Sequence, residues 1–590
     1  MNFSRSFVGL LPLLLATGCG PKAPVAPPTT SHVVTNPLVA KCEPGQRGGR
    51  LTLLTAAPPR TFNPLLAMDA ASDQAVRLLF GSLLLLDATT QEAGAGMAES
   101  WSVEPDGKTW KFKLRAGLHW SDGQPLTAED VVFTWNEVMY NPDMNRMTYD
   151  LFRINGTNFA VSKLDDVTVR VVTPEPFAPF LEFFGSVPIL PRHAMAREVQ
   201  ERRFLSVFTL NSRPDRIVGS GPFRVKHVQP DGAALLERNP EYWAVDATGQ
   251  RLPYFDEVLL QPVSGASPTY FFLNGQGDVC ETARVSEQDA IRAAASTGKF
   301  RVLELGVGTE RDFLWFNLNT NRDTAGRPYV APPKARWFQA KAFRQAVSCA
   351  LDRDRLVKEV YGGRAQPALT FVGKDNPKWH NPEVPTFGYD LARARSLLAG
   401  LGIQDRNGDG VLEDAAGQAI EFTLHSNTGN PGREKCAALI AEDLQRLGCR
   451  VNYQPLEFPK LVEKINLSFD YECVLMGLGG GGVDPTSQIN VLKSSESLHQ
   501  WFPNQSSPAT DWEARLDVLM DEQMRTLNLA DRKRAFDEVQ RILAEQLPMI
   551  YTVAPFHIAA ARPELANLRP AILSPYRLTW NAEQICFRKP

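Results

Sequence analysis

The chain contains 590 residues, and its 63 basic and 66 acidic side chains leave a formal net charge of −3 at pH 7. This balance excludes the strong electrostatic field that a nucleic-acid-binding protein or a receptor for an acidic surface would carry. Hydrophobic residues make up 43% of the chain, so a chain of this length can form two or three domains with cores of their own.

The N-terminus has the pattern of an export signal. Arg5 supplies a positive start, residues 7–15 are mostly apolar, and the small residues 16–18 precede Cys19. The apolar segment is too short, and too interrupted by Pro12, to span a bilayer in the mature chain. The end of the signal resembles a lipobox, which implies that Cys19 is lipid-modified. An ordinary signal peptide cut elsewhere is the alternative.

A tether is expected next, because residues 20–44 are rich in Pro, Ala, Thr and Val and poor in charge. No later segment has the roughly 18 uninterrupted apolar residues of a membrane span. The seven cysteines after Cys19 form no CxxC pair, which argues against a zinc or iron–sulfur centre. We expect Cys349 and Cys436 to be core thiols. Export permits disulfides, but the spacings leave their pairing open.

Regular structure begins with a short strand at residues 48–54. After proline-containing breakers, a helix is expected at residues 75–85. Residues 110–114 alternate between apolar and cationic side chains, which predicts a half-buried strand, and residues 118–120 suggest a second short strand. Thr127 then suits a helix N-cap, with Asp130 completing a capping box.

Segment 110–135 as a whole resembles the hallmark sequence of the family 5 extracellular solute-binding proteins, the peptide- and nickel-binding receptors of ABC importers. A string of about 25 residues with fixed Trp, Asp, Gly and Pro positions is far more specific than a single glycine motif. Further segments resemble the family in the same order: GSGPFRV at 219–225, RNPEYW at 238–243, LPYFDEV at 252–258, and the helix that begins at 341.

The resemblance implies an α/β fold with two lobes, the periplasmic-binding-protein (Venus-flytrap) fold of the large three-domain oligopeptide-binding type. Chain crossings between the lobes would then act as a hinge for closure. The expected divisions are a signal peptide at 1–18, a flexible tether at 19–46, lobe one from 47–82 with 213–305 and 559–590, an inserted domain at 83–212, and lobe two at 306–558.

Within the expected lobe two, strand patterns at residues 420–424 and 449–453 flank a helical pattern at residues 433–447. Strand, helix and strand with short links predict a βαβ unit with parallel strands and a right-handed crossover. A final helical region is expected at residues 512–547.

One candidate metal loop stands out. Asp405, Asn407 and Asp409 occupy positions 1, 3 and 5 of a calcium-type loop with glycine at position 6. Position 12 is an alanine, so the usual bidentate carboxylate is missing, and Glu413 or Asp414 could replace it only in a tighter loop. A turn-rich insertion without metal explains the same residues. A structural calcium ion is therefore a hypothesis, and no other cofactor is expected.

The glycine run containing Gly479, Gly480 and Gly481 lacks the Lys-Ser/Thr pair of a phosphate loop. Its glycines could let the backbone approach a ligand, or form a mobile surface loop. In peptide-binding family members this stretch holds an aspartate for the ligand's α-amino group, and an arginine before it meets the carboxylate. Alignment on Pro485 puts Gly481 and Leu475 at those positions, so free short peptides lose two charged anchors here.

Other candidate ligand contacts come from three places in the chain, and each of them could equally serve as a core or capping residue. They are the main chain at Asp69, Ala70, Ala71 and Ser72, the side chains of Asn317 and Asn319, and the aromatic ring of Phe458.

Catalysis finds no support, because no GxSxG, HExxH or paired-carboxylate pattern is present. The eight histidines lack ligand spacing, which argues against direct nickel ligation, and we expect His119 and His193 to be structural. The sequence thus predicts an exported, lipid-anchored, monomeric receptor that captures an oligopeptide-like solute and delivers it to an ABC permease and its ATPase. One alternative is a receptor for another solute, a saccharide or a chelated metal. The other is an extracellular sensor or scaffold that has no transport partner.

Overall fold

The structure, a computed structural model, describes residues 32–141, 143–144, 152–154, 156–308, 311–477, 483–503, 505–572 and 576–588. The predicted export signal, Cys19 and the glycines 479–481 lie outside these residues. Within the described ranges, no helix combines the length and the apolar character that a membrane span requires.

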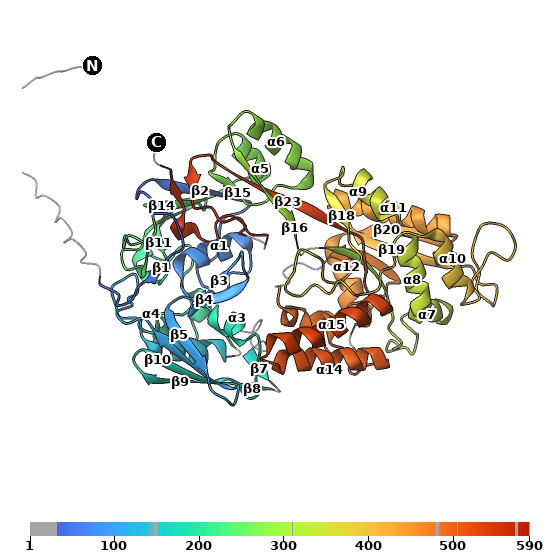
Figure 1. The fold of residues 1–590 in the computed structure, drawn as a ribbon, viewed down its shortest axis with the longest axis horizontal. Helices are drawn as coiled ribbons and strands as arrows, with labels where there is room; N and C mark the ends of the chain where they lie inside the picture. Colours follow the sequence, from blue (N-terminus) through green and yellow to red (C-terminus); the bar gives the residue numbers. More distant parts are fainter. Residues whose placement is uncertain are drawn as a thin grey trace, which may run out of the picture. The chain divides into compact units, whose positions relative to one another are not determined.

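The largest sheet has eight strands and mixes parallel with antiparallel pairs (Figure 1). At its centre β14 and β15 both run parallel to β2, whose Leu51 and Leu53 are buried. Seven strands follow the order β11 (Phe223–Val228), β12 (Ala234–Arg238), β14 (Glu257–Pro262), β2 (Arg50–Thr55), β15 (Val279–Cys280), β23 (Val553–Ala561) and β16 (Arg301–Val307), and β18 (Ala365–Pro367) pairs with β23.

A second sheet has five strands, in the order β20 (Arg450–Leu456), β19 (Glu421–Asn427), β21 (Cys473–Gly477), β17 (Asp312–Phe316) and β22 (Ile550–Tyr551). β19 runs parallel to both β20 and β21, and α11 (Pro431–Leu447) packs on all three. The predicted βαβ unit is therefore confirmed. Its helix buries Cys436, Ile440 and Leu444 against the sheet, which explains the apolar stripe in the sequence.

Two short connections join these two sheets directly, and β18, which lies between β17 and β19 in the sequence, also returns from the five-stranded sheet to pair with β23. β16 of the eight-stranded sheet is followed directly by β17 of the five-stranded sheet, and β22 of the latter returns to β23 of the former. In Figure 1 the long strand β23 lies beside β15 and β16 at one end and beside β18 at the other. Two short crossings of this kind are the covalent arrangement that a hinge requires.

A third sheet of four antiparallel strands lies between α1 and β11 in the sequence. Its order is β5 (Ala98–Val103), β6 (Thr109–Leu114), β10 (Thr168–Val172) and β9 (Ala160–Asp165). Two-stranded pairs complete the strands: β1 (Leu38–Val39) with β13 (Ala244–Val245), β3 (Leu84–Asp87) with β4 (Glu92–Ala95), β7 (Arg153–Ile154) with β8 (Thr157–Asn158), and β24 (Leu565–Ala566) with β25 (Cys586–Phe587).

The helices that cover these sheets are mostly short. They are α1 (Ala70–Leu79), α2 (Ala128–Phe133), α3 (Phe180–Gly185), α4 (Arg192–Gln200), α5 (Pro268–Leu273), α6 (Gln288–Ser296), α7 (Pro332–Gln339), α8 (Lys341–Ala350), α9 (Arg353–Glu359), α10 (Leu391–Ala399), α11, α12 (Phe458–Glu463), α13 (Ile489–Leu492), α14 (Asp511–Arg525) and α15 (Leu529–Gln546). The region predicted at 512–547 is thus two helices, because Asn528 caps a new one.

The hallmark segment folds as its chemistry predicts in two of its three parts. β6 buries Trp110, Phe112 and Leu114, and the Thr127–Asp130 capping box starts α2. The second short strand is wrong: residues 118–120 make only an isolated bridge, between His119 and Pro125, although Leu118 and Trp120 are buried. The backbone of residues 124–126 lies alongside, with Trp120 N–H donating to the Gln124 carbonyl (2.8 Å) and Leu126 N–H to the Leu118 carbonyl (2.9 Å), but this single bridge around a tight turn is too short to form a strand.

The helix expected at residues 75–85 is displaced. α1 begins after Asp69, whose carboxylate accepts the backbone N–H of Ser72 (2.9 Å), and it ends before Phe80, which is extended. Leu84 already belongs to β3. Apolar residues continue from α1 into β3, and a short apolar run fits a helix as well as a strand. The sequence therefore does not show where α1 ends.

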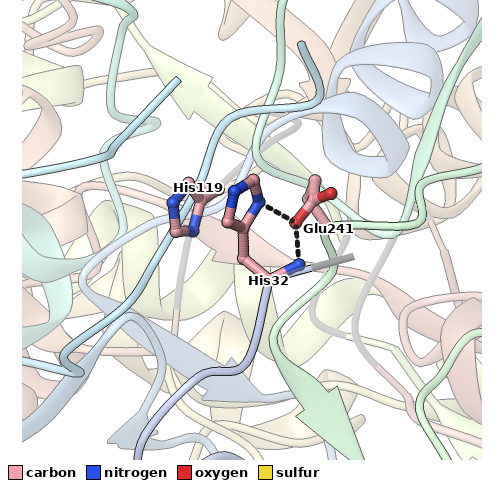
Figure 2. Close-up of side chains that lie close together, drawn as sticks. All are labelled: His32, His119 and Glu241. Carbon is pink, nitrogen blue, oxygen red and sulfur yellow. Dashed lines mark hydrogen bonds and ion pairs between the residues drawn. The ribbon is translucent and has the colours of Figure 1, made fainter. Parts of the chain in front are cut away.

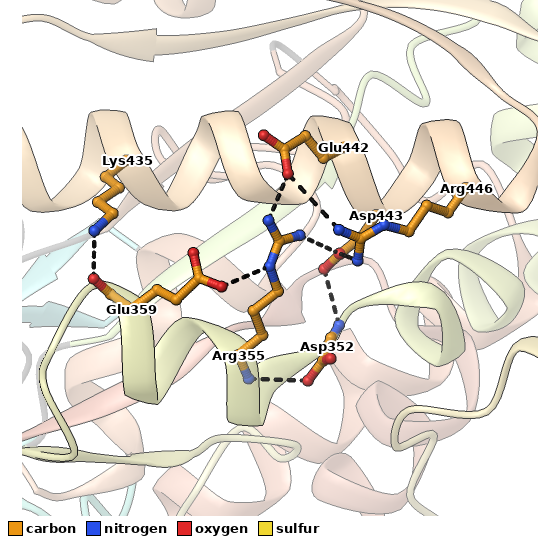
Figure 3. A network of polar contacts seen from close by, with 7 residues as sticks. All are labelled: Asp352, Arg355, Glu359, Lys435, Glu442, Asp443 and Arg446. Atoms are coloured by element: carbon orange, nitrogen blue, oxygen red, sulfur yellow. Dashed lines mark hydrogen bonds and ion pairs between the residues drawn. The ribbon is translucent and has the colours of Figure 1, made fainter.

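A charged network joins α9 to α11 (Figure 3). Asp443 on α11 is almost fully buried, and its carboxylate accepts the backbone N–H of Asp352 (3.0 Å) and the guanidinium of Arg355 (3.1 Å). Arg355 also pairs with Glu442 and Glu359. Since each buried carboxylate oxygen has a donor, this network holds the two helices together without an unpaired charge.

All seven cysteines among the described residues are free thiols. Cys349 and Cys436 have no exposed surface, so their prediction as core thiols is confirmed. Burial raises the pKa of Cys436 to about 12, and this keeps the thiol protonated and unreactive.

Candidate functional site

The carboxyl ends of three parallel strands meet at one edge of the five-stranded sheet. β19 ends at Asn427, β20 at Leu456 and β21 at Gly477, and the first two ends lead directly into α11 and α12. In open α/β sheets ligands bind outside this edge, where helix N-termini present free N–H groups. We refer to it as the carboxyl edge.

Charged side chains are concentrated at the carboxyl edge. Arg433, in the first turn of α11, makes a two-pronged ion pair with Asp312 at 2.7 and 3.1 Å and also donates to Asn427 (2.6 Å). Beside them Arg311 pairs with Asp375 at 2.5 Å, and both side chains are buried. These four charges come from separate segments and match no motif, so the sequence alone does not reveal that they lie together.

Phe458 belongs to this edge as well. It is the first residue of α12, directly after β20, and 52% of its surface is exposed. Phe458 thus presents an aromatic ring to solvent next to the carboxyl end of β20, and its contact with a ligand remains a prediction. The glycine run follows Gly477, the last residue of β21, but Gly479, Gly480 and Gly481 lie outside the described residues. Their role stays a prediction.

Asn317 and Asn319 lie at the opposite edge. β17 runs antiparallel to β21, so Asp312 faces Gly477 while Phe316 faces Cys473, and the two asparagines follow Phe316. Asn317 is fully buried, donates to the carbonyls of Phe469 and Tyr471 (3.0 Å each), and accepts the N–H of Asn319. Asn319 donates to Pro503 and accepts the N–H of Asn321.

The segment from Asp69 to Ser72 forms the N-terminus of α1. Asp69 caps the helix, and the Ser72 hydroxyl donates to its other carboxylate oxygen (2.7 Å). Ala71 and Ser72 are buried, and the Ala70 carbonyl accepts the Tyr576 hydroxyl (2.7 Å). The Ser72 N–H and the Ala70 carbonyl thus have structural partners, and contact of this segment with a ligand remains a prediction.

The candidate calcium loop brings three carboxylates together. One oxygen each of Asp405, Asp409 and Glu413 lies within 4.8 Å of the others, so Glu413 takes the place that sequence spacing left open. Asn407 instead donates to Glu413 (3.0 Å), and Asp405 accepts the N–H groups of Gly408 and Gly410. These bonds are those of a self-contained turn. Calcium binding stays a prediction.

Leu475 and Gly481 stand where peptide-binding family members are expected to carry charged anchors, and of these two residues the structure describes only Leu475. Leu475 lies inside β21 with no exposed surface, paired with Leu314, so it belongs to the core. The nearest described charge after the glycine run is Asp484, whose carboxylate pairs with Arg532 at 2.5 and 2.6 Å in a buried site. Asp484 is thus already neutralised by a guanidinium of α15.

The segment that follows strand β10 of the four-stranded sheet, residues 173–185, contacts the helices α14 and α15. We call this sheet with its following segment the four-stranded region. The backbone N–H of Ala178 donates to the Met524 carbonyl (2.6 Å), and Arg525 pairs with Glu175 (2.5 Å). Glu182 on α3 faces Asp484 and the cations Lys378 and Arg532. Burial, together with the Asp484 charge, raises the pKa of Glu182 to about 7.

Comparison with known proteins identifies the chain's relatives. The family model for bacterial extracellular solute-binding proteins, family 5, middle region, matches residues 92–499. A probable ABC transporter-binding protein of Deinococcus radiodurans is 28% identical over 86% of this chain and 87% of its own. The oligopeptide-binding protein AppA of Bacillus subtilis is 26% identical over 91% of this chain and 92% of its own.

Solved structures share the fold. AppA of Bacillus subtilis, in complex with a nonapeptide, superimposes with a TM-score of 0.67 over 92% of this chain and all of its own, at 24% identity. The periplasmic binding protein MelB of Agrobacterium fabrum, in complex with stachyose, gives 0.69 over 92% of this chain and 86% of its own, at 20% identity. The expected two-lobed periplasmic-binding fold is confirmed.

Proposed function

Because the chain belongs to the bacterial extracellular solute-binding proteins of family 5, a family of ABC transporter receptors and not of enzymes, we propose that it captures an oligopeptide-like solute for import. The solute would lie between the lobes and would be passed to a membrane permease driven by an ATPase. The mechanism is binding with closure: contacts from both lobes give the ligand a higher affinity for the closed form.

The observation that carries this proposal is the carboxyl edge of the five-stranded sheet. It combines the N-terminus of α11, the exposed ring of Phe458 and the polar pair of Arg433 with Asp312. Backbone N–H groups and an aromatic ring recognise peptide units of any sequence, which is the requirement of an oligopeptide receptor. The name of AppA, a relative over nine-tenths of the chain, points to the same class of solute.

Peptide termini would contribute little here. Leu475 is buried and Gly481 has no side chain, so neither position offers the charge that would pair with a free α-amino or carboxylate group. We therefore expect an extended peptide held through its main chain. Blocking both ends by acetylation and amidation should change the Kd of a bound peptide by less than about threefold, whereas one lost charge-assisted bond would cost about tenfold or more.

Anchoring completes the proposal. A lipid on Cys19 would hold the mature chain at the membrane. Of the predicted tether at 19–46, only the part before His32 would span the distance to a permease, because Leu38–Val39 pair with β13 and Val34 and Ala40 are buried in the folded chain. Replacing Cys19 by Ser should release the exported protein from the membrane fraction. A Cys19→Ser protein that stays in that fraction would contradict the anchor, and Cys42→Ser is the matched control because Cys42 is part of the folded structure.

A saccharide is the second candidate solute, because MelB has the same fold and was solved with stachyose. The lack of charged anchors at Leu475 and Gly481 is compatible with it. Mass spectrometry of whatever copurifies with the protein separates the two. A mixture of peptides is the expected result, and a carbohydrate or a chelated metal would overturn the peptide assignment.

A further inference from the structure

Three side chains that are far apart in the sequence meet where the N-terminal segment joins the folded chain (Figure 2). His32 precedes β1, His119 lies between β6 and α2, and Glu241 lies between β12 and β13. One donor atom of each lies within 4.8 Å of the other two. We propose that a zinc ion binds to His32, His119 and Glu241. The ion would fasten the segment before β1, residues 32–37, to the rest of the domain.

Two of the three ligands are held in place by the surrounding backbone. Glu241 is 6% exposed, and its N–H donates to Asn239 (3.0 Å), which is itself fully buried and donates to the Gly221 carbonyl (2.8 Å). Nδ1 of His119 lies 2.9 Å from the carbonyl oxygen of Gly117. Since a carbonyl only accepts, this nitrogen carries the proton, and Nε2 keeps a lone pair for a metal.

The third ligand approaches from the N-terminal segment. Both the backbone N–H and Nδ1 of His32 contact the same oxygen of Glu241, at 3.1 and 3.2 Å. Arg251 donates to the carbonyl of His32 (2.5 Å) and to that of Pro240. One guanidinium therefore holds together the two backbone segments that carry His32 and Glu241 before any ion binds.

Zinc fits this donor set better than calcium or magnesium. Two imidazole nitrogens and one carboxylate oxygen are common zinc ligands, whereas calcium and magnesium take oxygen donors. The rings of His32 and His119 are stacked, with centroids 3.7 Å apart and planes 12° from parallel. Imidazole lone pairs lie in the ring plane, so one ring must turn before both point at one ion.

His32 is the ring that can turn. Its side chain is 47% exposed, whereas His119 and Glu241 are fixed by the contacts described above. Donor atoms in a tetrahedral zinc site are roughly 3.4 Å apart, so a movement of about 1–2 Å closes the site. The remaining positions on the ion face solvent and would hold water. This site is separate from the carboxyl edge, and its existence does not depend on the solute.

The test is calorimetric titration of Zn²⁺ into the full chain, with excess calcium present so that the 405–413 loop does not compete. One tight site is expected, and His32→Ala, His119→Ala and Glu241→Gln should each weaken it by about tenfold or more. His193→Ala is the control, because its ring pairs with Asp122 (2.8 Å) in the same region and should leave the affinity unchanged.

Two results would overturn the site: a full chain that binds no Zn²⁺, or a tight site that all three variants retain. The His32 variant keeps the test valid even if Glu241→Gln disturbs folding, because His32 is exposed and only its ring is removed. As a second readout, zinc should raise the Tm of the parent protein and of His193→Ala but not that of His32→Ala.

Discussion

Among single residues, the buried Asn317 shows how a polar side chain can stabilise the core. It makes three hydrogen bonds: its amide group donates to two carbonyls and accepts the N–H of Asn319. Asn317→Ala would leave these buried groups unpaired, so we expect a loss of about 2–4 kcal/mol in the free energy of unfolding. Urea denaturation measures it, and ligand affinity of the folded variant should stay within threefold of the parent.

The matched control is Asn321→Ala, since Asn321 is exposed and close in the chain. Its cost should stay below about 0.5 kcal/mol. If Asn317→Ala instead kept its stability and lost ligand affinity, Asn317 would be a ligand contact, as the sequence interpretation suggested, and the structural assignment would be wrong.

At the element scale, the turn before β11 depends on two glycines that lie against the end of α1. A Cβ on Gly219 would sit 2.0 Å from the carbonyl oxygen of Leu79, and one on Gly221 would sit 2.6 Å from that of Leu78. Backbone cannot yield as a side-chain tip can, so Gly219→Ala should lower the free energy of unfolding by about 1–3 kcal/mol or more.

Gly388→Ala provides the comparison, because nothing lies within 4 Å of its Cβ position and its φ is not left-handed. That variant should be neutral or slightly more stable, since alanine has less freedom in the unfolded chain. Equal stability of the Gly219 and Gly388 variants by thermal denaturation would refute the close approach.

Elements also show what the sequence could predict. Strand β6, the capping box of α2 and the βαβ unit follow from local patterns, and the structure has all three. The end of α1 and the shortness of the pairing at residues 118–120 leave no mark in the local pattern of apolar residues. The carboxyl-edge charges and the cluster of His32, His119 and Glu241 were not predicted, because spacing cannot show which loops the fold brings together.

At the scale of the whole molecule, Glu182 links folding to pH across the contact between the four-stranded region and α15. Its pKa in the folded chain is raised to about 7 from an ordinary 4.5, by burial and by Asp484, against the opposing charges of Lys378 and Arg532. The folded state therefore holds this proton more tightly, and stability present below pH 4.5 is lost as pH rises through about 7.

Glu182→Gln removes this titration while keeping the shape of the side chain. Between pH 5 and pH 8 the Tm of the variant should therefore fall less than that of the parent, by roughly 1–3 °C. Glu92→Gln is the control, because Glu92 is exposed and its substitution should leave the pH profile unchanged. Parallel profiles for the parent and the Glu182 variant would contradict the raised pKa.

The proposed receptor has two lobes, joined by the β16–β17 and β22–β23 crossings, that we expect to close on the solute. Small-angle X-ray scattering of the purified protein, first freed of ligand and then saturated with the solute that copurifies, measures this directly. We expect a smaller radius of gyration with ligand, because contacts from both lobes favour the closed form. An unchanged radius at saturation would contradict it.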